Sequence, residues 1–252
     1  MSTFLETADT IDPALGLGFS LFSPLHWGWL AFFALFTCVV SLLYRSGDCT
    51  ARVRWRRGLA FALVADELFK MAGLFIGGNY MFDYLPLHLC SINILLIAVH
   101  AFRPSRTLDN FLYTVCIPGA LAALLFPTWT ELPFFNFMHL HSFTVHTLLA
   151  AYPIVLTVGG DIRPDIRYVP RCLLLLLGMA IPIYGINRLL DTNFMFLMDV
   201  EPGNPLYPFE QAWGNHLYGF PVLIAAVIAV MYAPVYASRV LRRLAAQRNL
   251  AA

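Results

Sequence analysis

Three histidines stand at the start of an apolar stretch that is long enough to cross a bilayer. The stretch reads HLHSFTVH over residues 139–146 and continues as TLLAAYPIVLTV. At about 100° per residue, His139, Ser142 and His146 share one helical face, while His141 points elsewhere. Polar groups inside a membrane segment are costly and usually face the interior of a bundle. We therefore interpret His146 as a catalytic or ligand-contacting residue beside a polar chamber, and His139 as either a substrate contact or an interface anchor.

Cys90 is the thiol that could act with these histidines. Acyl transfer needs a nucleophile, a base that activates it, and donors for the oxyanion. Cys90 follows His88 by two residues, and on a regular helix that spacing turns two side chains about 200° apart. Pro86 just before them allows an irregular first turn. Two readings stay open: Cys90 is a nucleophile with His146 or His88 as its base, or it is a small buried hydrophobe.

A second group of ionisable residues lies on one apolar segment. Asp66 and Glu67 precede Lys70 by four and three residues, so either carboxylate can meet the ammonium along one helix. Such a group either neutralises itself within the membrane or orients a histidine or a lipid headgroup. Asn93, on the next segment at a similar depth, is a further candidate substrate contact.

Asn187 and Arg188 close another apolar segment. A guanidinium fork matches phosphate and carboxylate, so this pair could clamp an anionic headgroup. Alternatively, Arg188 only extends its side chain to the interface. The loop that follows, residues 191–216, carries Asn193 and an apolar FMFLM block. We expect this loop to cover the chamber as a lid, with Asn193 among the substrate contacts.

The composition is that of a membrane protein with several spans. Of 252 residues, 59% are hydrophobic and 12% are charged, and the mean hydropathy is +0.69, which excludes an ordinary soluble domain. The net charge of +1 gives no indication of a nucleic-acid partner. Five cysteines without paired spacing, and no HxxxH or HExxH motif, predict neither disulfides nor a metal site, and we expect no cofactor. Residues 1–23 carry no basic n-region, so we expect an outer N-terminal segment rather than a cleavable signal.

Seven apolar segments have the length that a bilayer's hydrocarbon core requires. Charged or Gly/Pro-rich joints separate them, and no internal repeat is visible. We therefore predict one all-α membrane bundle of seven transmembrane helices over residues 1–252. The segments are Leu25–Tyr44, Leu59–Asn79, Leu85–Phe102, Leu108–Leu125, Met138–Val158, Cys172–Leu190 and Leu217–Tyr236.

Arginine placement predicts the orientation. Almost all basic residues fall in the first, third and fifth joints and in the tail of residues 237–252, which the positive-inside rule makes cytoplasmic. We expect an outer N-terminus, a cytoplasmic C-terminus and a location in the bacterial inner membrane. In this orientation Lys70, Cys90 and His146 lie at a similar level, roughly 5–14 Å beneath the outer surface at 1.5 Å per residue.

Three blocks of the sequence resemble one family. They are the LPLHLC run that ends at Cys90, the segment that contains His146, and the NRLLDTNFMFL run of residues 187–197. Together they are similar to the YwaF-like bacterial integral membrane proteins, over nearly the whole chain. That family more distantly resembles the animal membrane acyltransferase family that makes polyunsaturated ether phospholipids, and beyond it Thr/His membrane hydrolases of fatty-acid esters.

The resemblance implies, by analogy, a multi-helix fold with an acyl-transfer site inside the membrane. His88 matches the histidine of the PLH block, and His146 matches the histidine of the fifth helix. In the acyltransferase family the nucleophilic cysteine directly precedes the first histidine, a position that Leu87 occupies here. The resemblance therefore does not by itself assign a covalent mechanism to this chain, whose nearby thiol is Cys90.

We interpret the chain as a membrane-embedded enzyme that transfers or hydrolyses acyl groups of membrane lipids at an outward-facing chamber. The alternative is a transporter or lipid-binding protein that holds an anionic headgroup with the ionisable group of residues 66–70 and Arg188. A transporter needs a second gate with its own polar residues near the cytoplasm. The inner halves of these segments offer few, which favours the enzyme.

The predicted orientation can be tested by labelling. In a variant without the five native cysteines, Ala252→Cys should react with a membrane-impermeant maleimide only after cells are permeabilised, because the arginines hold the tail in the cytoplasm. Ser2→Cys is the control and should react in intact cells. Labelling of position 252 in intact cells would contradict the orientation.

Overall fold

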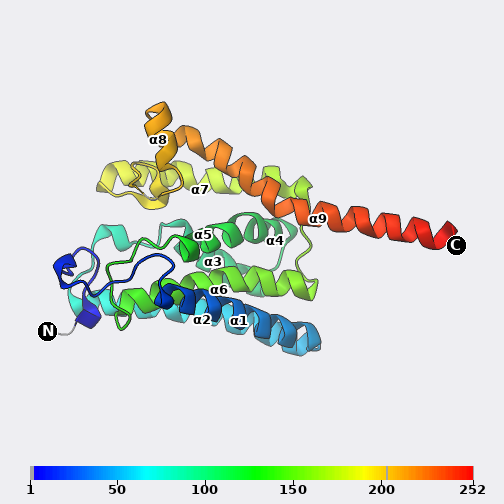
Figure 1. The fold of residues 1–252 in the computed structure, drawn as a ribbon, viewed down its shortest axis with the longest axis horizontal. Coiled ribbons are helices and arrows are strands. Elements are labelled where there is room, and N and C mark those ends of the chain that lie inside the picture. The colour runs from blue at the N-terminus through cyan, green and yellow to red at the C-terminus, as the bar shows by residue number, and fades with distance from the viewer. Residues whose placement is uncertain (1–2, 203, 252) are drawn as a thin grey trace.

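Helix α6, Phe137–Gly159, lies at the centre of the bundle. In the computed structural model, which describes residues 3–202 and 204–251, α1, α2, α3 and α5 pack against α6 (Figure 1). Asn136 caps its first turn by accepting hydrogen bonds from the N–H groups of Met138 and His139. Of its most apolar stretch, 67% is buried inside the protein. This helix therefore brings its histidines into the interior.

The described residues form helices and short helical turns, without a strand. The all-α class predicted from the sequence is confirmed. A π turn, Leu112–Cys116, joins α4 and α5 into one span. The other helices are α1 Pro24–Ser46, α2 Cys49–Gly77, α3 Leu89–Phe102, α4 Arg106–Phe111, α5 Ile117–Leu125, α7 Val169–Leu190, α8 Tyr207–Trp213 and α9 Gly219–Ala251.

Within the described chain, six spans are long and apolar enough to cross a membrane, and each overlaps one of the predicted segments. The remaining predicted segment, Leu59–Asn79, lies almost wholly in α2 and is not among the six, because its apolar part carries the charged residues Asp66, Glu67 and Lys70. The number of seven spans therefore stays a prediction, as does the orientation of the chain. The six are Pro24–Ser46, Phe82–Phe102, Arg106–Leu125, Phe137–Gly159, Ile166–Leu190 and His216–Ser238.

Helix α2 begins about three turns earlier than the predicted segment. Asp48 caps it by accepting a hydrogen bond from the N–H of Ala51, which satisfies one of the donors that a helix start leaves unpaired. Arginine is a good helix former, so the RVRWRR run of residues 52–57 continues the helix. The arginines that the sequence placed in a loop therefore lie on the first turns of α2.

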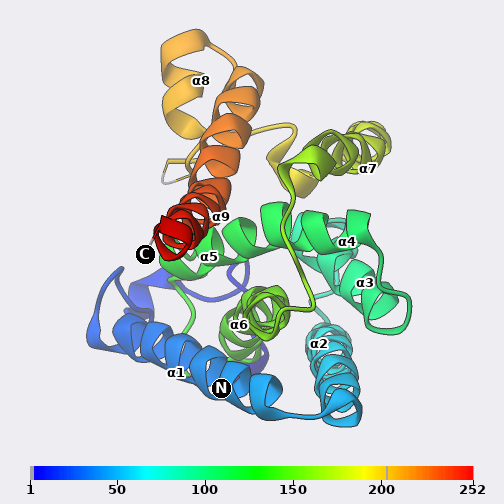
Figure 2. The same cartoon turned by 90° about the vertical axis from the view of Figure 1, so that its right-hand side faces the viewer.

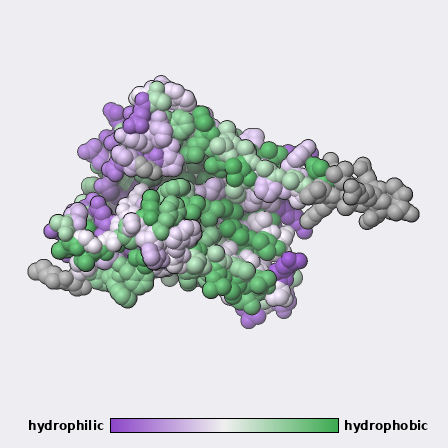
Figure 3. Space-filling model, viewed as in Figure 1, coloured by the Kyte–Doolittle hydropathy of each residue, from purple (hydrophilic) through white to green (hydrophobic). Residues whose placement is uncertain are grey.

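Helices α7 and α9 lie at the edge of the bundle, apart from α1, α2 and α6 (Figure 2). Only 11% of the α7 span and 6% of the α9 span is buried inside the protein. Their exposed side chains include Leu174, Ile181 and Val230, and the visible surface is apolar in the middle and more polar toward both ends (Figure 3). Such a surface suits contact with lipid tails.

Gly73 on α2 shows how closely α6 approaches. A Cβ added there would lie 2.2 Å from the ring of Phe137, a side chain that is completely buried. Overpacking of this kind costs about 1–3 kcal/mol, so we expect Gly73→Ala to lower the Tm of the purified protein by several degrees. Gly58→Ala on the same helix, where an added Cβ meets nothing within 4 Å, is the control and should leave the Tm unchanged or slightly higher. Equal Tm values for the two variants would contradict this packing.

Candidate functional site

A thiol and an imidazole meet between α3 and α6. Sγ of Cys90 lies 3.1 Å from Nε2 of His146. Nδ1 of His146 lies 2.6 Å from the carbonyl oxygen of Ser142, one turn earlier on α6. Because a carbonyl oxygen can only accept, Nδ1 carries the proton and Nε2 of the neutral ring can accept the thiol proton. This is the arrangement of a nucleophile and its base.

The chain is irregular just before Cys90. The short turn Phe82–Tyr84 and Pro86 precede α3, which begins only at Leu89. His88 is the residue before the helix and has an extended backbone. Cys90 is therefore the second residue of α3, in the first turn, where backbone N–H groups lack partners within the helix. The 200° separation of a regular helix does not apply, since His88 lies outside the helix.

Two unpaired polar atoms lie close to the thiol and the imidazole. The indole of Trp129 stacks on His146 with ring centroids 5.3 Å apart and planes 7° apart. Its Nε1, and Oδ1 of Asn93, are buried without a hydrogen-bond partner among the described residues. Asn93 is 3% exposed and lies one turn after Cys90, on the same face of α3. Because buried polar atoms are nearly always paired, these two are candidates to bind a ligand.

His88 contacts the lid-like loop of residues 191–216. Its ring packs edge-on against Phe194, with centroids 5.1 Å apart, and Phe194 is completely buried. Within the described residues, no hydrogen bond or ring contact joins His88 to His146. The sequence offered either His146 or His88 as the base for Cys90, and the structure brings His146 to the thiol.

Asn187, which the sequence paired with Arg188 as an anion clamp, supports the loop of residues 191–216. The side chain of Asn187 donates to the carbonyl oxygen of Phe194 at 3.0 Å and accepts from its N–H at 2.9 Å. Asn193 accepts from the N–H groups of Met198 and Asp199. Both asparagines thus use polar atoms inside the loop. Arg188 is exposed and forms no ion pair within the described part of the chain.

His216 and Glu210 were not singled out by the sequence, yet they also hold this loop. One ring nitrogen of His216 lies 3.0 Å from the carbonyl oxygen of Phe196, and the other lies 3.0 Å from Glu210. Phe196 and its neighbour Met195 have φ values of 53° and 60°, a left-handed backbone that costs free energy in residues other than glycine. The contact with His216 helps to keep that conformation. The signal in the sequence was the position of His216 immediately before the predicted segment Leu217–Tyr236.

The ionisable group on α2 is shared between two helices. Glu67 pairs with Lys70 and accepts a hydrogen bond from the hydroxyl of Ser91 on α3 at 3.3 Å. Both carboxylates also face α6. Asp66 lies 3.0 Å from Nδ1 of His141 and accepts a hydrogen bond from a threonine hydroxyl at 2.9 Å, and Glu67 lies 3.9 Å from Nε2 of His141. The spacing allowed Lys70 to pair with either carboxylate, and in the structure it pairs with Glu67. His141, which helical periodicity placed on another face, binds α2.

A family model now joins these observations. The model of the TMEM164 family matches residues 21–232. The chain belongs to the TMEM164 family. The match includes Cys90 and His146, and it supports a transmembrane protein with several apolar helices, a coarser statement than the YwaF-like resemblance. No curated protein and no solved structure matches the chain.

His139 of this TMEM164-family protein is enclosed by aromatic rings. Trp29 donates its indole N–H to Nε2 of His139 at 3.0 Å, and Nδ1 lies 3.1 Å from the carbonyl oxygen of Leu132. The side chain is completely buried, so both ring nitrogens are held by protein groups and fasten α6 to α1. Among the described residues, no group of three or more His, Cys, Asp or Glu side chains is placed to hold a metal ion.

The Glu67–Lys70 pair yields a stability prediction. Lys70 is 7% exposed, and removing one partner of a buried pair costs roughly 3–5 kcal/mol because the other charge is left uncompensated. We expect Lys70→Met to lower the Tm strongly and Glu67→Gln to restore part of the loss when it is added. In the matched control, Asp66→Asn added to Lys70→Met should not restore the Tm, because Asp66 pairs with His141 of α6 and not with Lys70. Additive effects of the Lys70 and Glu67 changes would contradict the pairing.

Proposed function

We propose that this TMEM164-family protein is a membrane-embedded enzyme that moves acyl groups of membrane lipids, with Cys90 as nucleophile and His146 as base. The observation that carries the proposal is the 3.1 Å contact between Sγ of Cys90 and Nε2 of His146. The hydrogen bond from Nδ1 of His146 to Ser142 supports it, because it presents the acceptor nitrogen to the thiol. Acyl lipids supply the ester carbonyl on which such a pair acts.

The first half-reaction forms a thioester. As Sγ of Cys90 attacks the ester carbonyl carbon of a phospholipid, the thiol proton passes to Nε2 of His146. The tetrahedral intermediate then breaks its carbon–oxygen bond to the glycerol backbone, and the imidazolium returns that proton to the leaving oxygen. A lysophospholipid leaves, and the acyl group stays on Cys90.

The second half-reaction releases the acyl group. The hydroxyl of an acceptor lysolipid gives its proton to His146 and attacks the thioester, and the thiolate leaves and recovers the proton from the imidazolium. With water in place of the acceptor the product is a free fatty acid, so transfer and hydrolysis use the same residues. An imidazole suits both steps, because one ring nitrogen can accept a proton in one step and return it in the next.

The remaining groups of the site fit supporting roles. The N–H groups in the first turn of α3, which have no partner within the helix, are donors of the kind that stabilise an oxyanion. Oδ1 of Asn93 and the indole N–H of Trp129 are buried without a hydrogen-bond partner among the described residues, and they suit the polar part of a substrate. Glu67, through Ser91, holds α2 against the residue next to Cys90.

The orientation of the chain belongs to the proposal. With the arginine-rich end in the cytoplasm, Cys90 and His146 lie toward the outer leaflet of a bacterial inner membrane, and α2 counts as a seventh span. A charged helix of this kind can cross a bilayer when its ionisable groups face the bundle and are paired. Lys70 and Asp66 each have such a partner.

A transporter or lipid-binding protein is the rival function. The sequence argued against a transporter because the inner halves of the helices hold few polar groups. That argument is weaker in view of the buried hydrogen-bonded network that His100, Tyr152 and Asp109 form near the arginine-rich end of the bundle. The contact between Cys90 and His146 is therefore what favours the enzyme.

Turnover of variants tests the proposal. In proteoliposomes that contain a fluorescent acyl phospholipid and a lysolipid acceptor, Cys90→Ser and His146→Gln should each lower acyl release by about 10²-fold or more, the scale of a lost nucleophile or base. Cys38→Ser, which removes an exposed thiol, is the control and should keep full turnover. Near-native Tm values for the variants exclude a folding defect.

Two outcomes would overturn the assignment. Full turnover of Cys90→Ser together with loss in His146→Gln would mean that the imidazole activates water or a lipid hydroxyl directly. Full turnover of His146→Gln would mean that this histidine is structural.

A further inference from the structure

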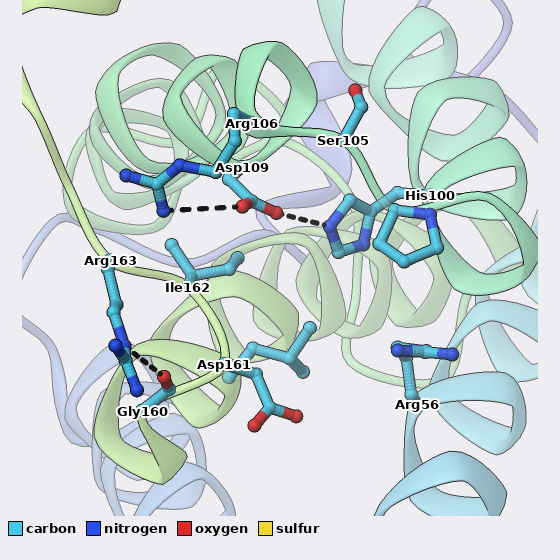
Figure 4. Close-up of a pocket in the computed structure, with 11 residues that line it drawn as sticks. Arg56, His100, Ser105, Arg106, Asp109, Gly160, Asp161, Ile162 and Arg163 are labelled. Carbon is cyan, nitrogen blue, oxygen red and sulfur yellow. Dashed lines mark hydrogen bonds and ion pairs between the residues drawn. The ribbon is translucent and has the colours of Figure 1, made fainter.

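A cleft opens at the arginine-rich end of the bundle, away from Cys90. Its volume is about 580 Å³, and α2, α3, α4 and the joint between α6 and α7 supply its walls (Figure 4). A second cleft of about 390 Å³ shares Arg56 and Asp161 with it. Volumes of this size are typical of small-molecule sites. His100 in its wall follows Cys90 by ten residues on α3, or about 15 Å along the helix, so the cleft is separate from the thiol.

The acidic residues of the cleft are already paired. Asp109 lies 2.8 Å from Nε2 of His100 and 3.8 Å from Arg106. Asp161 accepts a hydrogen bond from the hydroxyl of Tyr44 and pairs with Arg52 at 3.3 Å. Figure 4 shows the carboxylate of Asp161 turned away from Asp109. Both negative charges of the cleft are thus partly compensated before any ligand arrives.

Two arginines have no such partner. Arg56 donates from Nε to the carbonyl oxygen of Ala101 at 3.1 Å, and Arg163 donates from Nε to the carbonyl oxygen of Gly160 at 3.1 Å. Neither forms an ion pair within the described residues. Each backbone contact fixes the direction of a guanidinium and leaves its two Nη groups to bind something else. Figure 4 places Arg56 and Arg163 on opposite sides of the cleft.

The wall between them is rigid. His100 is 1% exposed, with one ring nitrogen 2.8 Å from the hydroxyl of Tyr152 and the other on Asp109. Tyr152 is completely buried. The three side chains come from α3, α6 and α4, so they hold those helices at a fixed spacing. A preorganised wall lowers the entropy cost of binding a ligand.

We infer that this cleft binds a phosphate-bearing ligand between Arg56 and Arg163. A phosphate group presents oxygens on several sides and can accept from two guanidinium groups at once, whereas a carboxylate presents two oxygens in one plane. The volume exceeds what one phosphate fills, which fits an organic phosphate or diphosphate. The inference goes beyond acyl transfer and does not depend on it. The same chemistry is offered by a soluble phosphate compound and by the headgroup of an acidic phospholipid.

Binding measurements can distinguish the two sources. The protein is reconstituted in nanodiscs at low ionic strength, because salt screens exposed charges. In the first arm, inorganic pyrophosphate is titrated into nanodiscs of phosphatidylcholine, and the shift in Tm gives the affinity. In the second arm, phosphatidic acid replaces part of the phosphatidylcholine, without pyrophosphate. We expect a rise in Tm in at least one arm. A rise with pyrophosphate indicates a soluble phosphate compound, and a rise with phosphatidic acid indicates a lipid headgroup.

Arginine variants test the site itself. Arg56→Gln and Arg163→Gln should each weaken binding about tenfold or more, and the double variant should show no shift, because each loses charge-assisted hydrogen bonds. Arg56→Lys keeps the charge without the fork and should bind with intermediate affinity. Arg54→Gln removes an exposed arginine of the same helix that does not line the cleft, and it should bind as the native chain does.

The inference fails if the native protein shows no shift in either arm, or if Arg54→Gln weakens binding as much as Arg56→Gln does. The second result would mean that the anion responds to the general positive charge of this end. The Tm without ligand shows that each variant is folded. Arg56→Lys keeps the test valid if a glutamine variant does not fold.

Discussion

The structure depends on pairing the polar side chains that α6 carries into an apolar bundle. A buried polar group without a partner costs about 1–3 kcal/mol, and more in a membrane, where no water can replace the partner. Each histidine of α6 meets this requirement with a different neighbouring helix, so together they fix the rotation of α6 within the bundle. The three pairs are His139 with Trp29 of α1, His141 with Asp66 of α2, and His146 with Cys90 of α3.

These three contacts have different consequences. The partners of His139 and His141 are a tryptophan and a carboxylate, and both contacts hold helices together. The partner of His146 is a thiol, whose proton can be moved by an imidazole. This thiol lies at the start of a helix, beside buried polar atoms that find no partner in the described part of the chain. The same physical requirement that assembles the bundle thus also brings a thiol to an imidazole, the pair on which the proposed acyl transfer rests. Just before α3, His88 packs against Phe194 and so connects the start of this helix to the loop of residues 191–216. Asn187 and His216 support that loop.

The sequence predicted the apolar helices because a long apolar segment has the length that a bilayer's hydrocarbon core requires. Counting residues from the end of each predicted segment also placed Lys70, Cys90 and His146 at a similar predicted depth. The sequence could not show that α3 begins at Leu89, because that start depends on how the chain packs after the turn Phe82–Tyr84. Periodicity shows which residues share a face but not which neighbour the face meets, so the role of His141 was missed. Trp129 and His216 act from connecting segments, whose position is set by tertiary contacts that no local pattern records.

The central claim is that the thiol of Cys90 carries the acyl group during turnover, and the mass of the intact protein tests this most directly. After brief incubation with a phospholipid and no acceptor, followed by rapid acid denaturation, the protein should gain the mass of one acyl chain. Peptide mapping should place it on Cys90, neutral hydroxylamine should remove it as expected of a thioester, and His146→Gln should not form it. Turnover of the native protein without any adduct, or with an adduct on another residue, would contradict the account.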